Sequence, residues 1–256
     1  MTVMTTTRRD YLEQITNAPS IEELWSLHCA KMADYGFDRL LYGFTRYRTN
    51  TSLGDPEDFV ILTNHSTAYT DVFMGKGLYF HAPMVKWALS NEGACSWRVA
   101  AEMMTTGTLT ESERKVLEFN RSMNVTAGYA ISFKSISPRT KGAIALTGKP
   151  GMTQDDVDAI WEEYGRDIVI FNNVAHLKIL TLPYSGPARE LTKRQREALQ
   201  WVGDGKTTQD IALLMGLTAA TVEKHLRLAR ENLNVETTAQ AVLKAAFLNQ
   251  MFVIEA

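Results

Sequence analysis

Four charged side chains recur at helical spacing near the C-terminal end of the chain, in the segment LTAATVEKHLRLA (217–229) and just after it. They are Glu223, Lys224, Arg227 and Arg230. On a helix they point away from an apolar stripe made of Val222, Leu226 and Ala229. A guanidinium such as that of Arg227 can pair with guanine, the Lys224 ammonium can contact guanine or phosphate, and the Glu223 carboxylate can accept from cytosine. The outer face of this segment therefore suits the edges and the backbone of double-stranded DNA.

The surrounding sequence predicts a helix-turn-helix. TTQDIALLMGLTAATVEKHLRLA (207–229) has two amphipathic stretches separated by a short turn at Gly216, where a residue tolerant of positive φ is needed. In this motif the second helix enters the major groove. Four residues near helix N-termini are expected to contact phosphates: Lys206, Thr207, Thr218 and Thr221. The alternative is a small helical bundle with a solvated polar face.

Four short helices are expected after residue 190, because their starts are marked by capping residues. Thr218 is an N-cap for the second helix of the motif, and three other starts have the spacing of a capping box. These pairs are Thr192 with Gln195, Thr207 with Asp210, and Thr237 with Gln240.

Residues 191–242 resemble the C-terminal DNA-binding domain of LuxR-type regulators nearly end to end. The matching residues are Leu191, Thr192, Arg194, Glu197, Leu199, Gly205, Lys206, Thr207, Ile211, Ala212, Thr221, Val222, His225, Leu226, Leu233, Val235 and Ala241. Gln195 stands where the family usually has Glu, and it still completes a capping box. The resemblance implies that the last helix, from Thr237 to about Asn249, forms a homodimer that reads two half-sites about one helical turn apart.

Length, composition and a Pro- and Gly-containing segment predict two soluble domains. The chain has 256 residues, 45% of them hydrophobic, a net charge of −2 and two cysteines without paired spacing. It shows no secretory signal and no long apolar run, so we expect a cytoplasmic protein without membrane contact. The Pro- and Gly-containing segment TLPYSGPARE (181–190) is the expected linker between a ligand-sensing domain (8–180) and a DNA-binding domain (191–256).

The N-terminal part predicts an α+β domain. Strand patterns occupy 38–48, 58–64, 127–135 and 142–148, and helical patterns occupy 20–37, 66–76, 83–90, 110–124 and 153–178. Such an order favours an antiparallel sheet covered by helices on both faces, an α–β–α sandwich that can enclose a small-molecule cavity.

This N-terminal part resembles, more weakly, the autoinducer-binding domain of the same regulators. The resemblance follows STAYTDVFMGKGLYFHAPMVKWALSNEGACSW (66–97), in which Pro83 and Trp97 match, as does Gly128 downstream. Tyr69 stands in place of the usual Trp, and Phe73 in place of the usual Tyr. The ligand-binding residues expected from the resemblance are Tyr42, Tyr69, Phe73, Ala82, Trp97 and Thr147.

Ala82 is the departure with the largest consequence. In the acyl-homoserine-lactone receptors of this family an Asp at that place accepts a hydrogen bond from the ligand amide, which an alanine side chain cannot do. An unpaired buried amide costs ~1–3 kcal/mol, and Ala is also a poor N-cap before Pro83. Three interpretations remain open: a small molecule other than a lactone, an acyl-homoserine lactone bound differently, or a ligand-independent regulator.

The sequence does not favour an enzyme or a metalloprotein. It contains no Ser-His-Asp, Cys-His or paired-carboxylate arrangement, and no cofactor motif. His28, His65, His81 and His176 lack metal-ligand spacing. The aromatic residues of the N-terminal part are core residues by default, and they line a cavity only if the sheet leaves a hole.

Overall fold

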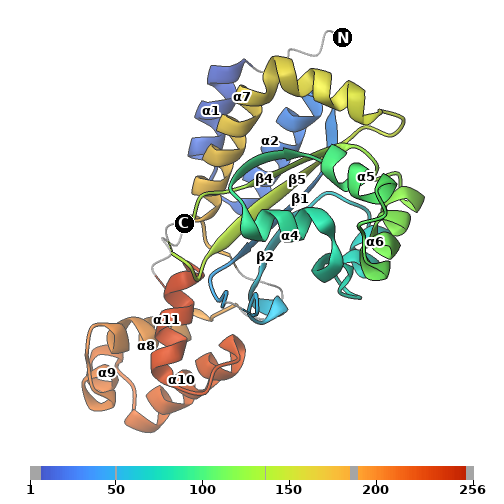
Figure 1. Ribbon diagram of the computed structural model, residues 1–256. Helices are drawn as coiled ribbons and strands as arrows, with labels where there is room; N and C mark the ends of the chain where they lie inside the picture. The colour runs from blue at the N-terminus through green and yellow to red at the C-terminus, as the bar shows by residue number, and fades with distance from the viewer. Residues whose placement is uncertain (1–6, 50, 136, 185–189, 252–256) are drawn as a thin grey trace. The chain divides into compact units, whose positions relative to one another are not determined.

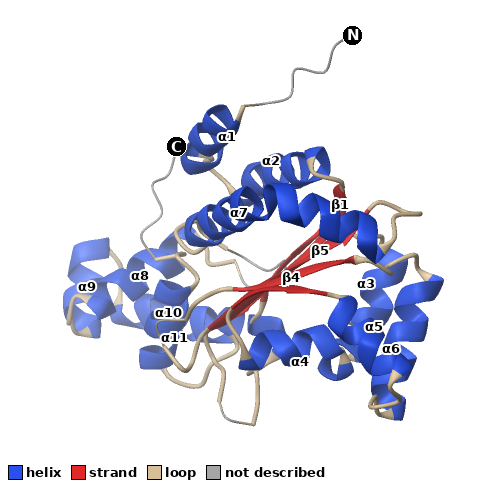
Figure 2. Cartoon of the chain, turned by 45° about the horizontal axis from the view of Figure 1, so that its top comes forward, coloured by secondary structure: helices blue, strands red, loops and turns tan. Residues whose placement is uncertain are grey.

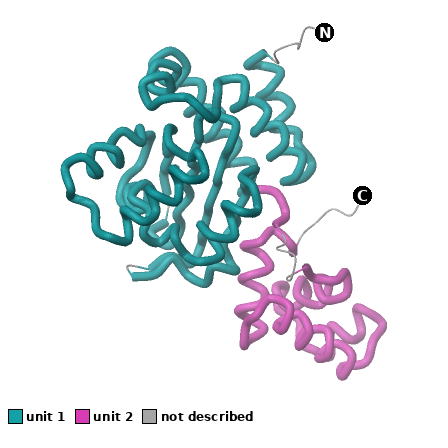
Figure 3. Tube along the Cα trace, turned by 90° about the vertical axis from the view of Figure 1, so that its right-hand side faces the viewer, with its two compact units in different colours: residues 1–180 teal, residues 181–256 magenta. Residues whose placement is uncertain are grey.

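The chain forms two compact units in the computed structural model, residues 1–180 and 181–256, coloured separately in Figure 3. The structure describes residues 7–49, 51–135, 137–184 and 190–251. Five residues of the expected linker, 185–189, lie outside this part. No helix within the described residues is both long and apolar enough to cross a membrane.

The first unit contains a five-stranded sheet and seven α-helices among its described residues. The helices are α1 (Arg8–Asn17), α2 (Ile21–Asp34), α3 (Thr67–Phe73), α4 (Pro83–Ser90), α5 (Arg98–Thr105), α6 (Glu111–Ser122) and α7 (Gln154–Ile179). Two 3-10 turns are η1 (Pro56–Asp58) and η2 (Leu78–His81). The strands are β1 (Phe37–Thr45), β2 (Val60–Thr63), β3 (Gly93–Ser96), β4 (Gly128–Ser132) and β5 (Lys141–Gly148).

The sheet has the order β2-β1-β5-β4-β3, and every neighbouring pair is antiparallel. Helices α2 and α7 cover one face, with α1 packed against these two helices, and α3 to α6 cover the other (Figures 1 and 2). The predicted α–β–α sandwich is thereby confirmed. Helix α1, strand β3 and helix α5 were not predicted from the sequence.

The two faces of the sheet differ sharply in side-chain size, because alternate residues of a strand point to opposite faces. Toward α7 the central strands present large residues: Tyr129 of β4 stacks on Trp161 of α7 with ring centroids 3.8 Å apart, and Phe133, directly after β4, stacks on His176 at 4.1 Å. Toward α3 to α6 the same strands present mostly small residues, among them Gly43, Ala130, Ala143 and Ala145, beside the larger Leu41.

Buried hydrogen bonds between side chains tie β1 to α7 and join α1, α2 and α7 to one another. The Tyr42 hydroxyl and His176 Nδ1 are 2.8 Å apart. Tyr11 is bonded to His28 Nδ1 at 2.7 Å, and His28 Nε2 to Asn172 Oδ1 at 3.0 Å. Burial lowers the pKa of both His28 and His176 to about 4, so each imidazole is neutral at pH 7. These histidines are part of the core.

The second unit is a small helical domain with α8 (Lys193–Gly203), α9 (Thr208–Met215), α10 (Ala219–Leu233) and α11 (Thr238–Phe247). The three expected capping boxes form, and Thr218 Oγ1 accepts from Thr221 N at 3.2 Å. Gly216 adopts φ +65°, as the turn requires. The predicted four helices and helix-turn-helix are confirmed.

Candidate ligand cavity and nucleic-acid interface

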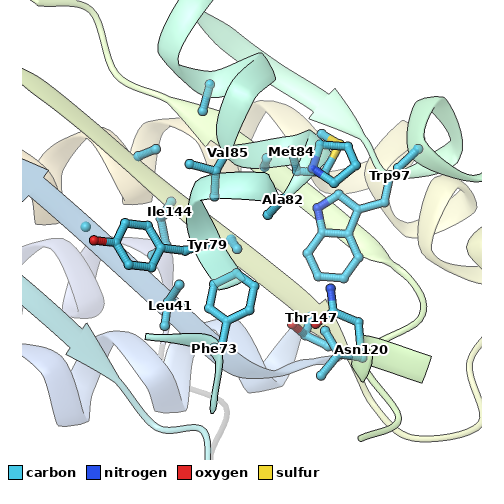
Figure 4. Close-up of a pocket in the computed structure, with 18 of the residues that line it drawn as sticks. Leu41, Phe73, Tyr79, Ala82, Met84, Val85, Trp97, Asn120, Ile144 and Thr147 are labelled. Carbon is cyan, nitrogen blue, oxygen red and sulfur yellow. The ribbon is translucent and has the colours of Figure 1, made fainter. Parts of the chain in front are cut away.

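A cavity of about 270 Å³ lies between the small-residue face of the sheet and the helices α3 to α6 (Figure 4). It exists because Gly43, Ala130, Ala143 and Ala145 leave the space that larger side chains fill on the opposite face. The rest of the lining is mostly aliphatic and aromatic, including Leu41, Val85 and Phe73. An apolar cavity with a few polar groups is typical of a small-molecule site.

Part of the cavity lining belongs to a stack of aromatic rings, of which His65, Tyr69 and Phe73 line the cavity. Tyr69 stacks on His65 with centroids 4.4 Å apart, on Phe73 at 5.1 Å and on Phe119 at 5.5 Å. Burial raises the pKa of Tyr69, so its hydroxyl keeps its proton, and it donates to Asn120 Oδ1 at 3.1 Å. Tyr69 thus has a partner within the protein.

Three residues that line the cavity each carry a buried polar atom without a hydrogen-bond partner among the described residues. These atoms are Tyr79 OH, Trp97 Nε1 and Thr147 Oγ1. Trp97 and Thr147 lie close together, since Gly128 pairs with Thr147 in the sheet and a Cβ added to Gly128 would lie 3.0 Å from the Trp97 ring. Tyr79 lies on the other side of the cavity in Figure 4. Buried polar groups are normally paired, so this arrangement indicates a place for a ligand with polar atoms.

Ala82 lies at the N-cap of α4 and lines the cavity, with 5% of its surface exposed. Its side chain makes no capping hydrogen bond, and Pro83 occupies the first turn. A carboxylate at this position would face the cavity and cap the helix. The methyl group of Ala82 lines the cavity, but it offers no hydrogen-bond acceptor there and does not cap the helix.

No Asp or Glu occurs among the described residues that line the cavity, whereas cations do. Lys141 is 8% exposed, and its Nζ donates to the Asn91 carbonyl at 2.9 Å, at the C-cap of α4. Desolvation lowers the pKa of Lys141, and it lowers that of His65 to about 4. The polar part of the lining is therefore rich in donors.

Five of the six expected ligand-binding residues line this one cavity: Tyr69, Phe73, Ala82, Trp97 and Thr147. Tyr42 does not line it, because it points to the opposite face of the sheet and bonds to His176. Its expected place in the pocket is corrected on this ground. Asn120 was missed, since its position on α6 gives no sequence signal that it meets Tyr69. His81 is exposed and does not line the cavity.

The recognition-type helix α10 has the polarity expected from the sequence. Val222, Leu226 and Ala229 are buried in the core of the second unit. Glu223, Lys224 and Arg227 are exposed on the other side. Thr208 Oγ1 donates to Glu223 Oε1 at 2.8 Å, which links α9 to α10.

The side chains of the other residues expected to contact DNA differ in how far they are already hydrogen-bonded within the protein. Lys206 is exposed. Thr207 Oγ1 is held in its capping box with Asp210, and Thr218 and Thr221 bond to each other at 2.9 Å. Arg230 is half-buried and donates to Thr238 Oγ1 of α11 at 2.8 Å, so its guanidinium is engaged within the domain.

Arg227 forms an ion pair with Glu231, one turn later on α10, at 2.5 Å. Both side chains are more than half exposed, and such pairs contribute only ~0–1 kcal/mol. We expect Glu231→Gln to raise affinity for a selected operator about two- to fivefold, because Arg227 can then contact DNA without first breaking its ion pair with residue 231. Fluorescence anisotropy at fixed salt measures this. Glu236→Gln, which removes the same charge from an exposed site, is the control, and an equal gain there would contradict the interpretation.

In comparisons with known proteins, each of the two units matches a family model. Residues 20–179 match the family model of the autoinducer binding domain, and residues 189–245 match that of the bacterial regulatory proteins of the luxR family. The chain is a LuxR-family transcriptional regulator. Regulators of this family bind DNA and are not enzymes, which agrees with the absence of a catalytic arrangement in the sequence.

Relatives of this LuxR-family regulator are similar over most of their length. It is 23% identical over 243 residues to the transcriptional activator protein AnoR of Acinetobacter nosocomialis, covering 94% of this chain and 97% of that one. It is 21% identical over 190 residues to the transcriptional activator protein LuxR of Aliivibrio fischeri, covering 73% of each.

Solved structures show the same fold. The N-acylhomoserine lactone dependent factor CepR2 of Burkholderia cenocepacia has a TM-score of 0.52 at 16% identity, over 67% of this chain and 92% of that one. SdiA in complex with octanoyl-rac-glycerol has a TM-score of 0.50 at 17% identity, over 100% and 99%. At these identities the likeness concerns the fold alone. No cluster of metal-binding side chains occurs among the described residues of this chain.

Proposed function

We propose that this regulator binds two operator half-sites as a homodimer, and that a small molecule in the cavity controls it. The observation that carries the proposal is the apolar cavity of about 270 Å³ with three buried polar groups lacking partners among the described residues. A ligand that pairs with these groups stabilises the folded first unit by mass action. The small molecule thereby becomes part of the core.

The ligand in this proposal is not an ordinary acyl-homoserine lactone. Ala82 offers no side-chain acceptor, and no carboxylate occurs among the described lining residues, so the lactone's amide N–H loses the partner that the family pattern supplies. The loss is ~1–3 kcal/mol, or about 5- to 150-fold in affinity. Related folds take chemically different molecules, as the complex of SdiA with octanoyl-rac-glycerol illustrates for that protein.

Dimer formation in this proposal uses α11, which the family resemblance assigns to it. Leu243 of α11 is 52% exposed although it is a large apolar residue. A second copy of the helix would cover it and place two recognition helices for two half-sites. On each half-site the expected contacts come from Lys206, Thr207, Thr218 and Thr221, together with Glu223, Lys224, Arg227 and Arg230.

Filling the cavity tests ligand control. Ala145 of β5 lies on the cavity floor, so Ala145→Phe is expected to exclude the ligand and abolish ligand-dependent changes. The measurement is mass spectrometry of small molecules released from protein purified from its native host. The melting temperature and operator affinity are then compared before and after that extract is added.

Ala159→Phe, at an exposed position of α7, is the matched control and should behave like the wild type. If wild-type protein binds its operator equally well with and without extract, and releases no small molecule, ligand control is wrong. The alternative, a ligand-independent regulator, is favoured by that result. The unfavourable N-cap at Ala82 is the observation that makes this alternative worth testing.

A further inference from the structure

We infer that the ligand group beside Ala82 is a hydrogen-bond acceptor, such as an ester or ketone oxygen, and that Trp97 Nε1 donates to it. This inference rests on the proposed function, in which the cavity binds a small molecule. It names the chemical class of that molecule at one point of the site and makes Trp97 a specificity-determining residue.

The indole N–H of Trp97 is the first observation. The nitrogen is buried and has no hydrogen-bond partner among the described residues. An indole nitrogen can only donate. In Figure 4 the nitrogen edge of the Trp97 indole is turned toward Ala82, and Trp97 packs against the buried cluster that contains Ala82.

The second observation is the scarcity of hydrogen-bond acceptors around Ala82. The Ala82 carbonyl already accepts from Lys86 N at 3.0 Å, within α4. The Asn120 side-chain oxygen accepts from the Tyr69 hydroxyl. With no Asp or Glu among the described lining residues, the surroundings of Ala82 offer a donor where a carboxylate would offer an acceptor.

The consequence is that the site prefers a ligand ester or ketone to a ligand amide, whereas a carboxylate at position 82 would favour the amide. A ligand amide N–H in this position meets another donor, whereas an ester oxygen or a ketone can accept the indole proton. The Thr147 hydroxyl is the competing group, because a hydroxyl can accept as well as donate. Any experiment has to separate the roles of Trp97 and Thr147.

The test compares two probes that differ in one atom group: N-octanoyl-homoserine lactone and α-octanoyloxy-γ-butyrolactone, its ester counterpart. Calorimetry on the full-length protein gives both dissociation constants. We expect the wild type to prefer the ester by about 5- to 150-fold, the range for one unpaired buried amide. We also expect the Trp97 indole N–H resonance to move downfield with the ester.

Two variants assign the preference. Trp97→Phe removes the donor and should bring the ester-to-amide ratio close to one. Because the ratio is taken within one variant, a general loss of stability cancels. Ala82→Asp restores an acceptor and should reverse the preference toward the amide.

Thr147→Val removes the competing hydroxyl and should leave the ester preference in place. Wild-type preference for the amide, an ester preference that survives Trp97→Phe, or no binding of either probe would each overturn the inference. None of these outcomes decides the proposed function, which is tested separately by the Ala145→Phe variant and the host extract.

Discussion

Gly128→Ala is expected to lower the free energy of unfolding of the first unit by about 1–3 kcal/mol, because the sheet has no room for a methyl group there. An added Cβ would collide with the Leu146 carbonyl oxygen and lie 3.0 Å from two carbons of the Trp97 ring. The neighbouring backbone cannot yield easily, since Gly128 N donates to Gln154 Oε1 at 3.0 Å and Gly128 O accepts from Trp97 N at 3.0 Å.

Gly43→Ala is the matched control on the same sheet. An added Cβ at Gly43 meets only Ile61 at 3.5 Å, an ordinary contact, and φ is not positive there. We expect this variant to be neutral or slightly stabilising, by up to ~1 kcal/mol, because alanine has less freedom to lose on folding. Urea-dependent hydrogen exchange of peptides from β4 and β5, with α10 peptides as an internal reference, measures both. Equal stability of the two variants would contradict the steric argument.

Arg227→Ala is expected to weaken specific operator binding by about 1–3 kcal/mol and to relax the preference at one base position. The reason is the exposed position of the guanidinium on the polar face of α10, where it can reach a base edge. Selection of bound sequences from a random library, for the wild type and the variant, measures the base preference. An unchanged preference would mean that α10 does not dock as proposed.

Lys206→Ala separates base contact from phosphate contact. Lys206 is exposed just before the N-cap of α9. Its loss should weaken binding evenly across sequences and reduce the slope of log affinity against log salt by about one. If Lys206→Ala instead changed the selected sequence, the assignment of Lys206 to phosphate would be wrong.

Local signals in the sequence were sufficient for the second unit. The capping boxes at Thr192, Thr207 and Thr237 and the positive φ of Gly216 depend on residues within one turn. Their energies are local, so a single sequence determines them. The same holds for the Thr110–Glu113 box at the start of α6.

The elements that were missed depend on distant partners. Strand β3 has four residues and takes its register from β4, where Ala94 pairs with Ile131. Helix α5 begins at Arg98, and its N-cap residue, Trp97, makes no side-chain capping hydrogen bond. Neither element carries a periodic pattern long enough to recognise without its tertiary neighbours.

The cavity was only partly predictable. Tyr42 was assigned to it wrongly because a shift of one residue along a strand moves a side chain to the other face, and the sequence does not say which face is which. A usable signal was nevertheless present: small residues alternate with large ones at 143–146, and again at Tyr129, Ala130 and Ile131. One face of such strands must either meet a very close neighbour or leave a hole.

The contrast in side-chain size between the two faces of the sheet affects how ligand selectivity can change during evolution. The aromatic and histidine face belongs to the packed core, whereas Gly43, Ala130, Ala143 and Ala145 set the depth and outline of the cavity floor. Carbons added at these floor positions extend toward the cavity and away from the other face, because alternate residues of a strand point to opposite faces. Variant libraries in which only these four residues are changed should therefore yield regulators with new ligand preferences, while most library members still fold.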